Sequence, residues 1–269
     1  MGGIIGSVHY GVMQGQYIRI HSVKVLGCDG SGALSDLLAG LMWVESNLEQ
    51  PAVINLSLEY TVYDASIASV LSSLTTLAYV SAAGGNDDEN SCDVYPGSET
   101  GLEGIGATTS VDARASYSNY GTCLGFFAPG DQIVSLWLDN GTQVLSGTSM
   151  ATAFSTGAGA LYLRDHPTPS NTPAVASVLL ASADTGDVTS AGTGSPNLLL
   201  YVGSWTPPPP GPSPSSPAPA PPPPPPAPAP TPSSPTPAPA PPSSSSSGGV
   251  ATLCVSTMLS LLLVVVSVV

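Results

Sequence analysis

Basic residues are scarce in this chain of 269 residues. Lysine and arginine together number 4, against 18 aspartates and glutamates, and the formal net charge is −14. A surface that binds nucleic acid needs a basic face to neutralise phosphates, so this composition argues against a nucleic-acid partner. The same shortage leaves no polybasic patch for anionic lipids. An acidic chain of this kind is typical of a soluble and extracellular protein.

Cysteine and histidine are also rare. The four cysteines are Cys28, Cys92, Cys123 and Cys254, and none of them forms a CxxC pair or a cluster with one of the three histidines. The spacing therefore predicts no metal site, and nothing in the sequence points to a cofactor. In an oxidising compartment two of the first three cysteines can pair, but the spacing alone leaves the pair open.

The composition divides the chain into three parts. Residues 1–203 are mixed in composition and numerous enough to bury a core, residues 204–249 are dominated by Pro, Ala, Ser and Thr, and residues 250–269 carry no charge. We expect one globular domain, a disordered Pro-rich stalk in the polyproline II conformation, and a hydrophobic tail. The stalk is expected to be a passive spacer; the alternative is a ligand for a proline-binding module.

The tail predicts attachment to a membrane. Its twenty residues would span about 30 Å as a helix, enough to cross a bilayer. Small residues precede it at 243–249, and no basic residue follows the apolar run. This pattern favours the signal for a glycolipid anchor, with a retained transmembrane helix as the alternative. We therefore expect an extracellular or cell-surface protein that contacts the membrane through its C-terminal segment.

Residues 1–203 alternate between strand-like and helix-like patterns. Apolar residues recur at helical spacing in Leu34–Leu48 and Asp64–Leu77, and short strand-like runs lie at His21–Gly27, Ala52–Leu58, Ala78–Gly84, Gly101–Thr108 and Gln132–Leu138. This alternation predicts an α/β fold in which helices flank both faces of a parallel sheet. Sites in such sheets form at the carboxyl ends of the strands.

The segment "SGTSMA" places Ser149 in front of a run of small and apolar residues from Ala151 to Leu163. We expect this run to form a buried helix that begins at Ser149. A serine hydroxyl is a weak nucleophile until a base removes its proton, and a helix N-terminus offers free amides to a developing oxyanion. The segment is thus a candidate site for acyl transfer.

Further segments occur in the same order as in a known family. They are "VINLSL" from Val53, "AAGGN" from Ala82, "SYSNYGTC" from Ser116 and "FFAPG" from Phe126. Together with "GTSMA" they make residues 2–202 resemble the subtilisin-like serine proteases, of the proteinase K and aqualysin type. The resemblance implies a subtilisin-like fold and a secreted, monomeric endopeptidase that cleaves peptides or proteins.

The resemblance implies a role for each matching position. Ser149 matches the nucleophile and Asn86 the side-chain donor of the oxyanion hole. The walls of the primary specificity pocket match Ser57, Leu58, Ala82, Ala83 and Gly84. The strand edge that pairs with the substrate backbone matches Gly30, Ser31 and Gly32. A disulfide of the family matches Cys92 and Cys123. The chain departs from the family at Glu59, where a carboxylate replaces glycine, and at Gly125, so we predict no calcium site there.

In this family a catalytic Asp and then a His precede the serine. The His segment would lie just before Gly2–Val12, and neither residue is present. Met1–Gly6 shows no signal-peptide pattern, and the family partner of Cys28 lies further upstream. We therefore expect an N-terminally truncated chain with an incomplete sheet, inactive as written. The alternative is a catalytically dead, surface-anchored protein that binds peptides or wall material.

Overall fold

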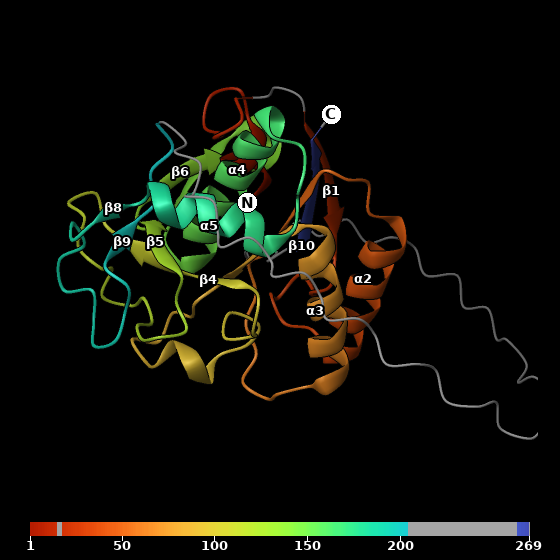
Figure 1. Cartoon of the computed structure of the whole chain (residues 1–269), viewed down its shortest axis with the longest axis horizontal. Helices are drawn as coiled ribbons and strands as arrows, with labels where there is room; N and C mark the ends of the chain where they lie inside the picture. Colours follow the sequence, from red (N-terminus) through yellow and green to blue (C-terminus); the bar gives the residue numbers. More distant parts are fainter. Residues whose placement is uncertain (15–17, 204–262, 269) are drawn as a thin grey trace, which may run out of the picture. The chain divides into compact units, whose positions relative to one another are not determined.

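The computed structural model describes residues 1–14, 18–203 and 263–268, and its elements follow one another as strands and helices (Figure 1). The helices are α1 (Gly2–Gly6), α2 (Leu34–Asn47), α3 (Ala65–Leu77), α4 (Thr148–Asp165) and α5 (Thr172–Ser182). The strands are β1 (Ile18–Val23), β2 (Ala52–Leu56), β3 (Tyr79–Ala83), β4 (Glu103–Thr108), β5 (Phe126–Pro129), β6 (Ile133–Leu136), β7 (Thr142–Leu145), β8 (Asp184–Thr185), β9 (Leu198–Leu199) and β10 (Leu263–Val268). Two 3₁₀ turns are η1 (Ser91–Asp93) and η2 (Leu138–Asn140).

The main sheet has the strand order β1-β10-β2-β3-β4-β5-β9-β8. Each pair of neighbours from β2 through β3, β4 and β5 to β9 is parallel. This confirms the predicted α/β architecture with a mostly parallel sheet. The strand predicted at Gln132–Leu138 is β6, but it pairs with β7 in a separate antiparallel hairpin. Its partner follows after a short turn, so this pairing is local.

Helices cover both faces of the sheet, as the sequence predicts. Val53 packs with residues of α1, α4 and α5, whereas Ile54 and Leu56 pack with residues of α2 and α3. Successive side chains of a strand point to opposite faces, and a parallel strand covered on both faces reads as a continuous apolar run. The run in β2 is of this kind, and all of its residues are buried.

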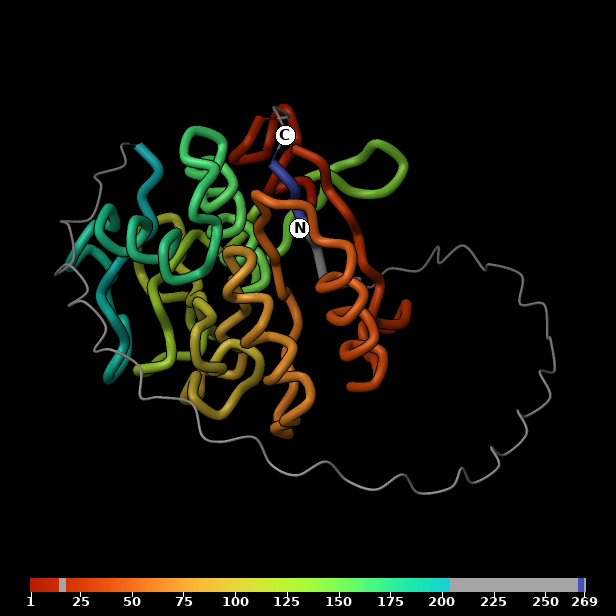
Figure 2. The backbone as a smooth tube through the Cα atoms, turned by 45° about the vertical axis from the view of Figure 1, so that its right-hand side comes forward, coloured from red at the N-terminus to blue at the C-terminus, as the bar shows by residue number. Residues whose placement is uncertain are grey.

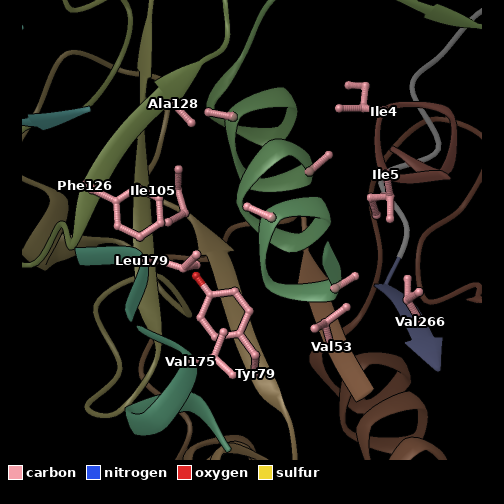
Figure 3. Packing of buried hydrophobic residues seen from close by; sticks show 14 of the residues in the cluster. Ile4, Ile5, Val53, Tyr79, Ile105, Phe126, Ala128, Val175, Leu179 and Val266 are labelled. Carbon is pink, nitrogen blue, oxygen red and sulfur yellow. The ribbon is translucent and has the colours of Figure 1, made fainter. Parts of the chain in front are cut away.

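Helix α4 runs through the interior, and 13 of its 18 residues are buried. Small side chains allow this, because they let the helix backbone approach its neighbours closely. A Cβ atom on Gly159 would lie 2.5 Å from the Tyr79 ring, and one on Gly157 would lie 2.7 Å from Val12. Figure 3 shows Tyr79, Ile105 and Phe126 on one side of α4 and Ile4, Ile5 and Val266 on the other.

The described end of the tail, residues 263–268, belongs to the main sheet, and the membrane attachment of the tail stays a prediction. Leu263–Val268 form strand β10, which lies between β1 and β2 and is antiparallel to both (Figure 2). The run "LVVVSV" is mostly β-branched and favours a strand, and both neighbouring strands offer backbone groups to it. The sheet is therefore mixed at this end.

The rest of the tail and the stalk of residues 204–249 lie outside the described residues, so the division at residues 203 and 249 and the lipid anchor stay predictions. In the part of the chain that the structure describes, no helix is long and apolar enough to span a membrane.

The close approach of α4 to β3 can be tested at Gly159. Gly159→Ala should lower the free energy of unfolding by about 1–3 kcal/mol, because the added methyl group meets the buried Tyr79 ring. Helix propensity alone predicts the opposite sign. Urea unfolding measures the change, and Gly2→Ala is the control, since a Cβ there meets only Ile20 atoms at 3.9–4.0 Å. A stabilised Gly159→Ala variant would contradict the tight packing.

A second prediction concerns Glu103, which begins β4 and whose carboxylate occupies the space beside Gly125. Burial raises the pKa of Glu103 to about 7 from an ordinary value of 4.5. The folded state therefore binds the proton more tightly than the unfolded chain, and stability falls as the pH rises from about 4.5 through about 7. Between pH 5 and pH 8 the loss attributable to this group should be about 2–3 kcal/mol.

Glu103→Gln should remove that part of the pH dependence, as measured by urea unfolding at the two pH values. Identical pH profiles for the two proteins would show that the carboxyl titrates normally.

Candidate active site

Ser149 lies in the first turn of α4, as predicted, and is 5% exposed. The helix begins at Thr148, one residue before the predicted start, and the Met150 N–H donates to the Gly147 carbonyl. Backbone N–H groups in the first turn of a helix have no carbonyl partner four residues back, and the helix dipole makes this end positive. The serine hydroxyl therefore stands in an environment that favours negative charge.

Asn86, which follows β3, is held beside this helix end. Its Oδ1 accepts hydrogen bonds from the Thr148 N–H at 2.8 Å and from the Thr148 hydroxyl at 3.1 Å. Because both donors bind the oxygen, the amide NH₂ group faces the other way, and Nδ2 donates to Glu59 Oε2 at 3.4 Å. The structure thus brings Asn86 and the start of α4 together and fixes the orientation of the Asn86 amide.

A buried chain of polar side chains connects α4 to β2. Asn55 Nδ2 donates to Ser57 Oγ at 2.9 Å, and Ser57 Oγ donates to the Ser149 carbonyl oxygen at 2.9 Å. On the other side of Asn55, its Oδ1 lies 3.2 Å from Thr156 Oγ1. All four side chains are almost inaccessible to solvent. Buried polar groups must be satisfied, so this chain sets the position of Ser149 relative to the strand ends.

The residues predicted as walls of the specificity pocket come together. Leu56 pairs with Ala82 in the parallel register of β2 and β3, so the segments that follow these two strands leave the sheet side by side. The walls Ser57, Leu58, Ala82, Ala83 and Gly84 are all buried. Backbone hydrogen bonds between Tyr60 and Tyr95 of 2.7 and 2.8 Å bring the segment before Gly97 against them. The role of these residues in substrate binding stays a prediction.

Gly30, Ser31 and Gly32, predicted to pair with the substrate backbone, are not part of a strand in the structure, and their pairing with a peptide stays a prediction. They lie in a turn between β1 and α2, in which the Gly27 N–H donates to the Ser31 carbonyl at 2.6 Å. The Ser31 N–H donates to Asp29 Oδ1 at 3.1 Å. These bonds engage the backbone groups of Ser31 within the turn. The turn does line a cavity of about 370 Å³ together with Leu58, Glu59 and Tyr60.

The three histidines lie in other settings. His166 follows the last turn of α4 and stacks on Tyr162, with 4.6 Å between ring centroids. It is about 25 Å along the helix from Ser149, given a rise of about 1.5 Å per residue. His21 on β1 lines a cavity with Trp43, and His9 lies in an exposed turn after α1.

The predicted disulfide between Cys92 and Cys123 is present, with a Cα–Cα distance of 5.1 Å. It joins η1 to the segment before β5. Cys28, expected to lack its family partner, is also disulfide-bonded, and the described residues contain no free cysteine.

Sequence reasoning missed Asn119, which shapes the loop after Asn86. Its buried Oδ1 accepts from the backbone N–H groups of Asp87 at 3.1 Å and Glu89 at 2.9 Å. Arg114 pairs with Asp88 in the same loop at 2.7 Å. The "SNYG" segment contains Asn119, but no local pattern shows that its side chain reaches a loop some thirty residues earlier. Only the tertiary contact identifies it.

The loop after β3 requires glycine at position 85. Gly85 has a φ of +104°, and a Cβ atom there would overlap the Asn119 amide. Gly85→Ala should therefore destabilise the chain by about 2–4 kcal/mol, from backbone strain and the clash together. Gly186→Ala is the matched control, because Gly186 has a φ of +87° but no atom within 4 Å of the added methyl group. Equal losses in urea unfolding would show that Asn119 does not pack against Gly85.

Comparisons with known proteins agree with this geometry. The model of the subtilase family, Peptidase_S8, matches residues 2–200. An extracellular serine proteinase of Thermus sp. (strain Rt41A) is 48% identical over 202 residues, which are 74% of this chain and 48% of the relative. Alkaline serine exoprotease A of Vibrio alginolyticus is 40% identical over 202 residues, which are 74% of this chain and 36% of the relative. The chain thus spans about half, or less, of the length of these relatives.

A solved structure gives the same result. The crystal structure of a cold adapted subtilisin-like serine proteinase superposes with a TM-score of 0.68 at 34% sequence identity, covering 76% of this chain and 73% of the other. The family match extends over most of the chain and includes Ser149 in α4 and Asn86 after β3. The chain therefore belongs to the subtilase family.

Proposed function

We propose that this chain is a serine-type endopeptidase in which Ser149 is the nucleophile. The strongest support is that Ser149 lies in the first turn of α4 and that Asn86 is hydrogen-bonded to Thr148, the residue before it. Attack by Ser149 Oγ on a peptide carbonyl would form a tetrahedral intermediate, release the amine and leave an acyl-enzyme that water then hydrolyses.

In this proposal the oxyanion of the intermediate accepts hydrogen bonds from the Ser149 N–H and from Asn86 Nδ2. The two hydrogen bonds that Asn86 Oδ1 accepts from Thr148 hold the amide in place before the substrate arrives. Preorganised donors of this kind need no rearrangement as charge develops. In a subtilisin, a member of the same family, loss of the equivalent side-chain donor lowers kcat by about 10²–10³.

The substrates we propose are peptides and unfolded protein segments. They would lie along a groove that includes the cavity lined by the turn at Gly30–Gly32, Leu58 and Glu59. The predicted pocket walls Ser57 and Ala82–Gly84 would receive one of their side chains. The relative from Thermus is named an extracellular enzyme, and the Cys92–Cys123 disulfide fits an oxidising compartment. We therefore propose an extracellular location and action as a monomer.

Hydrolysis also requires a group that takes the proton of Ser149. The three histidines of residues 1–269 lie at the end of α4, on β1 and in the turn after α1. This placement favours a second candidate function, in which the chain as given binds peptides in the groove without cleaving them. The two candidates differ in the reactivity of Ser149 and share the same binding surface.

A fluorophosphonate probe, which acylates activated serines, distinguishes the candidates. The longest polypeptide that the transcript encodes should be labelled at Ser149, and Ser149→Ala should abolish the labelling. Residues 1–269 alone should hydrolyse a peptide anilide about 10⁶-fold more slowly than a complete relative, the loss known for removal of the histidine from a subtilisin.

Labelling that survives Ser149→Ala would exclude Ser149 as the nucleophile. A folded transcript product that binds peptide but is not labelled would overturn the endopeptidase proposal in favour of the peptide-binding candidate.

A further inference from the structure

The cavity beside the turn at Gly30–Gly32 has an amphipathic lining. Leu26, Leu34, Leu37 and Leu58 supply apolar walls, and Glu59 is the only acidic residue among the lining side chains. Its volume of about 370 Å³ is within the range of pockets that hold a side chain or a small ligand. A carboxylate at the edge of an apolar pocket suits a long side chain that ends in a positive charge.

Glu59 has no basic partner in the described part of the chain. All four basic residues are described, and each is engaged elsewhere. Arg19 pairs with Glu49, Arg114 with Asp88 and Arg164 with Asp165, while Lys24 donates to the Leu26 carbonyl oxygen. The one polar neighbour of the Glu59 carboxylate with a hydrogen bond is Asn86, and that bond is long at 3.4 Å.

The surroundings of Glu59 add further negative charge. Partial burial of the side chain, and then the negative charge of Asp87, raise the pKa of Glu59 above its ordinary value. Asp87, the residue after Asn86, is thus close enough for its charge to act on Glu59. A cation bound here would compensate both charges, which the protein itself leaves without a counter-ion.

We propose that Glu59 makes this pocket a subsite for a lysine or arginine side chain of the bound peptide. The proposal rests on the peptide-binding groove of the proposed function and adds the chemistry that the groove selects. The alkyl stem of the side chain packs on Leu34, Leu37 and Leu58, and its charged end reaches the Glu59 carboxylate. Glu59 is thus a specificity-determining residue.

Binding of matched peptides tests the proposal without requiring catalysis. The probes are fluorescein-labelled alanine hexapeptides with one lysine at each position in turn, and the same peptides with norleucine, which keeps the alkyl stem and removes the charge. Fluorescence anisotropy with the full chain gives the Kd of each. At one position lysine should bind about five- to tenfold more tightly than norleucine, and Glu59→Gln should reduce that ratio to about one.

Urea unfolding of Glu59→Gln shows whether the variant is folded, and the test is the ratio of lysine to norleucine affinity within each protein. Glu45→Gln is the matched control, because Glu45 is an exposed glutamate of α2, and it should leave the lysine preference unchanged.

A lysine preference that persists in Glu59→Gln, or equal affinity for both peptides in the wild-type chain, would overturn the proposed role of Glu59. Either result would leave the proposed groove standing. Absence of binding by any peptide would instead contradict the proposed groove, and with it the subsite.

Discussion

The position of α4 inside the protein is the constraint on which the rest of the structure depends. A helix can run this close to a sheet only if its side chains are small where it meets the strands, as at Gly159 against Tyr79. Two buried polar side chains of the helix are bonded to β3: Ser155 to the Tyr79 hydroxyl at 2.8 Å and Thr156 to Ser81 at 2.8 Å. These specific contacts fix the helix in one register, because a shift along its axis would leave several buried hydroxyls without partners.

That register determines the geometry of the site. Since α4 cannot slide, its first turn is held at the carboxyl ends of β2 and β3, where Ser57 and Asn86 meet it. The core therefore positions Ser149, and the loops after β2 and β3 contribute Ser57 and Asn86. Removing a buried hydroxyl from this network would act on stability and on the site together, since both depend on the same contacts.

Local pattern was sufficient to predict much of this architecture. The apolar runs at Ala52–Leu58 and Ala78–Gly84 and the helical spacing in Asp64–Leu77 were predicted from residues close in sequence, and β2, β3 and α3 lie within them. The resemblance to the subtilisin-like proteases added candidates for the site, and the structure gathers Ser149, Asn86 and the pocket walls in one region. Their chemical roles cannot be read from proximity alone.

What could not be predicted depends on contacts between distant segments. The side chain of Asn119 reaches the loop after β3, and the turn at Gly27–Ser31 is closed by a backbone hydrogen bond from Gly27 to Ser31. The apolar tail was interpreted by length and hydropathy, which do not distinguish a membrane segment from a strand that completes a sheet. In the structure β10 pairs with β1 on one side and with β2 on the other, and both partners lie more than two hundred residues earlier in the chain.

Strand β10 has a consequence for the order of folding. It separates β1 from β2, and its partners in β1 lie about 250 residues earlier in the chain. During synthesis it leaves the ribosome after every other described element, so β1 lacks its β10 partner until that point. Contacts of such long sequence separation form slowly. Until β10 has been made, the backbone groups of β1 that it occupies in the folded protein lack this partner, and a chaperone that shields strand edges would improve the yield.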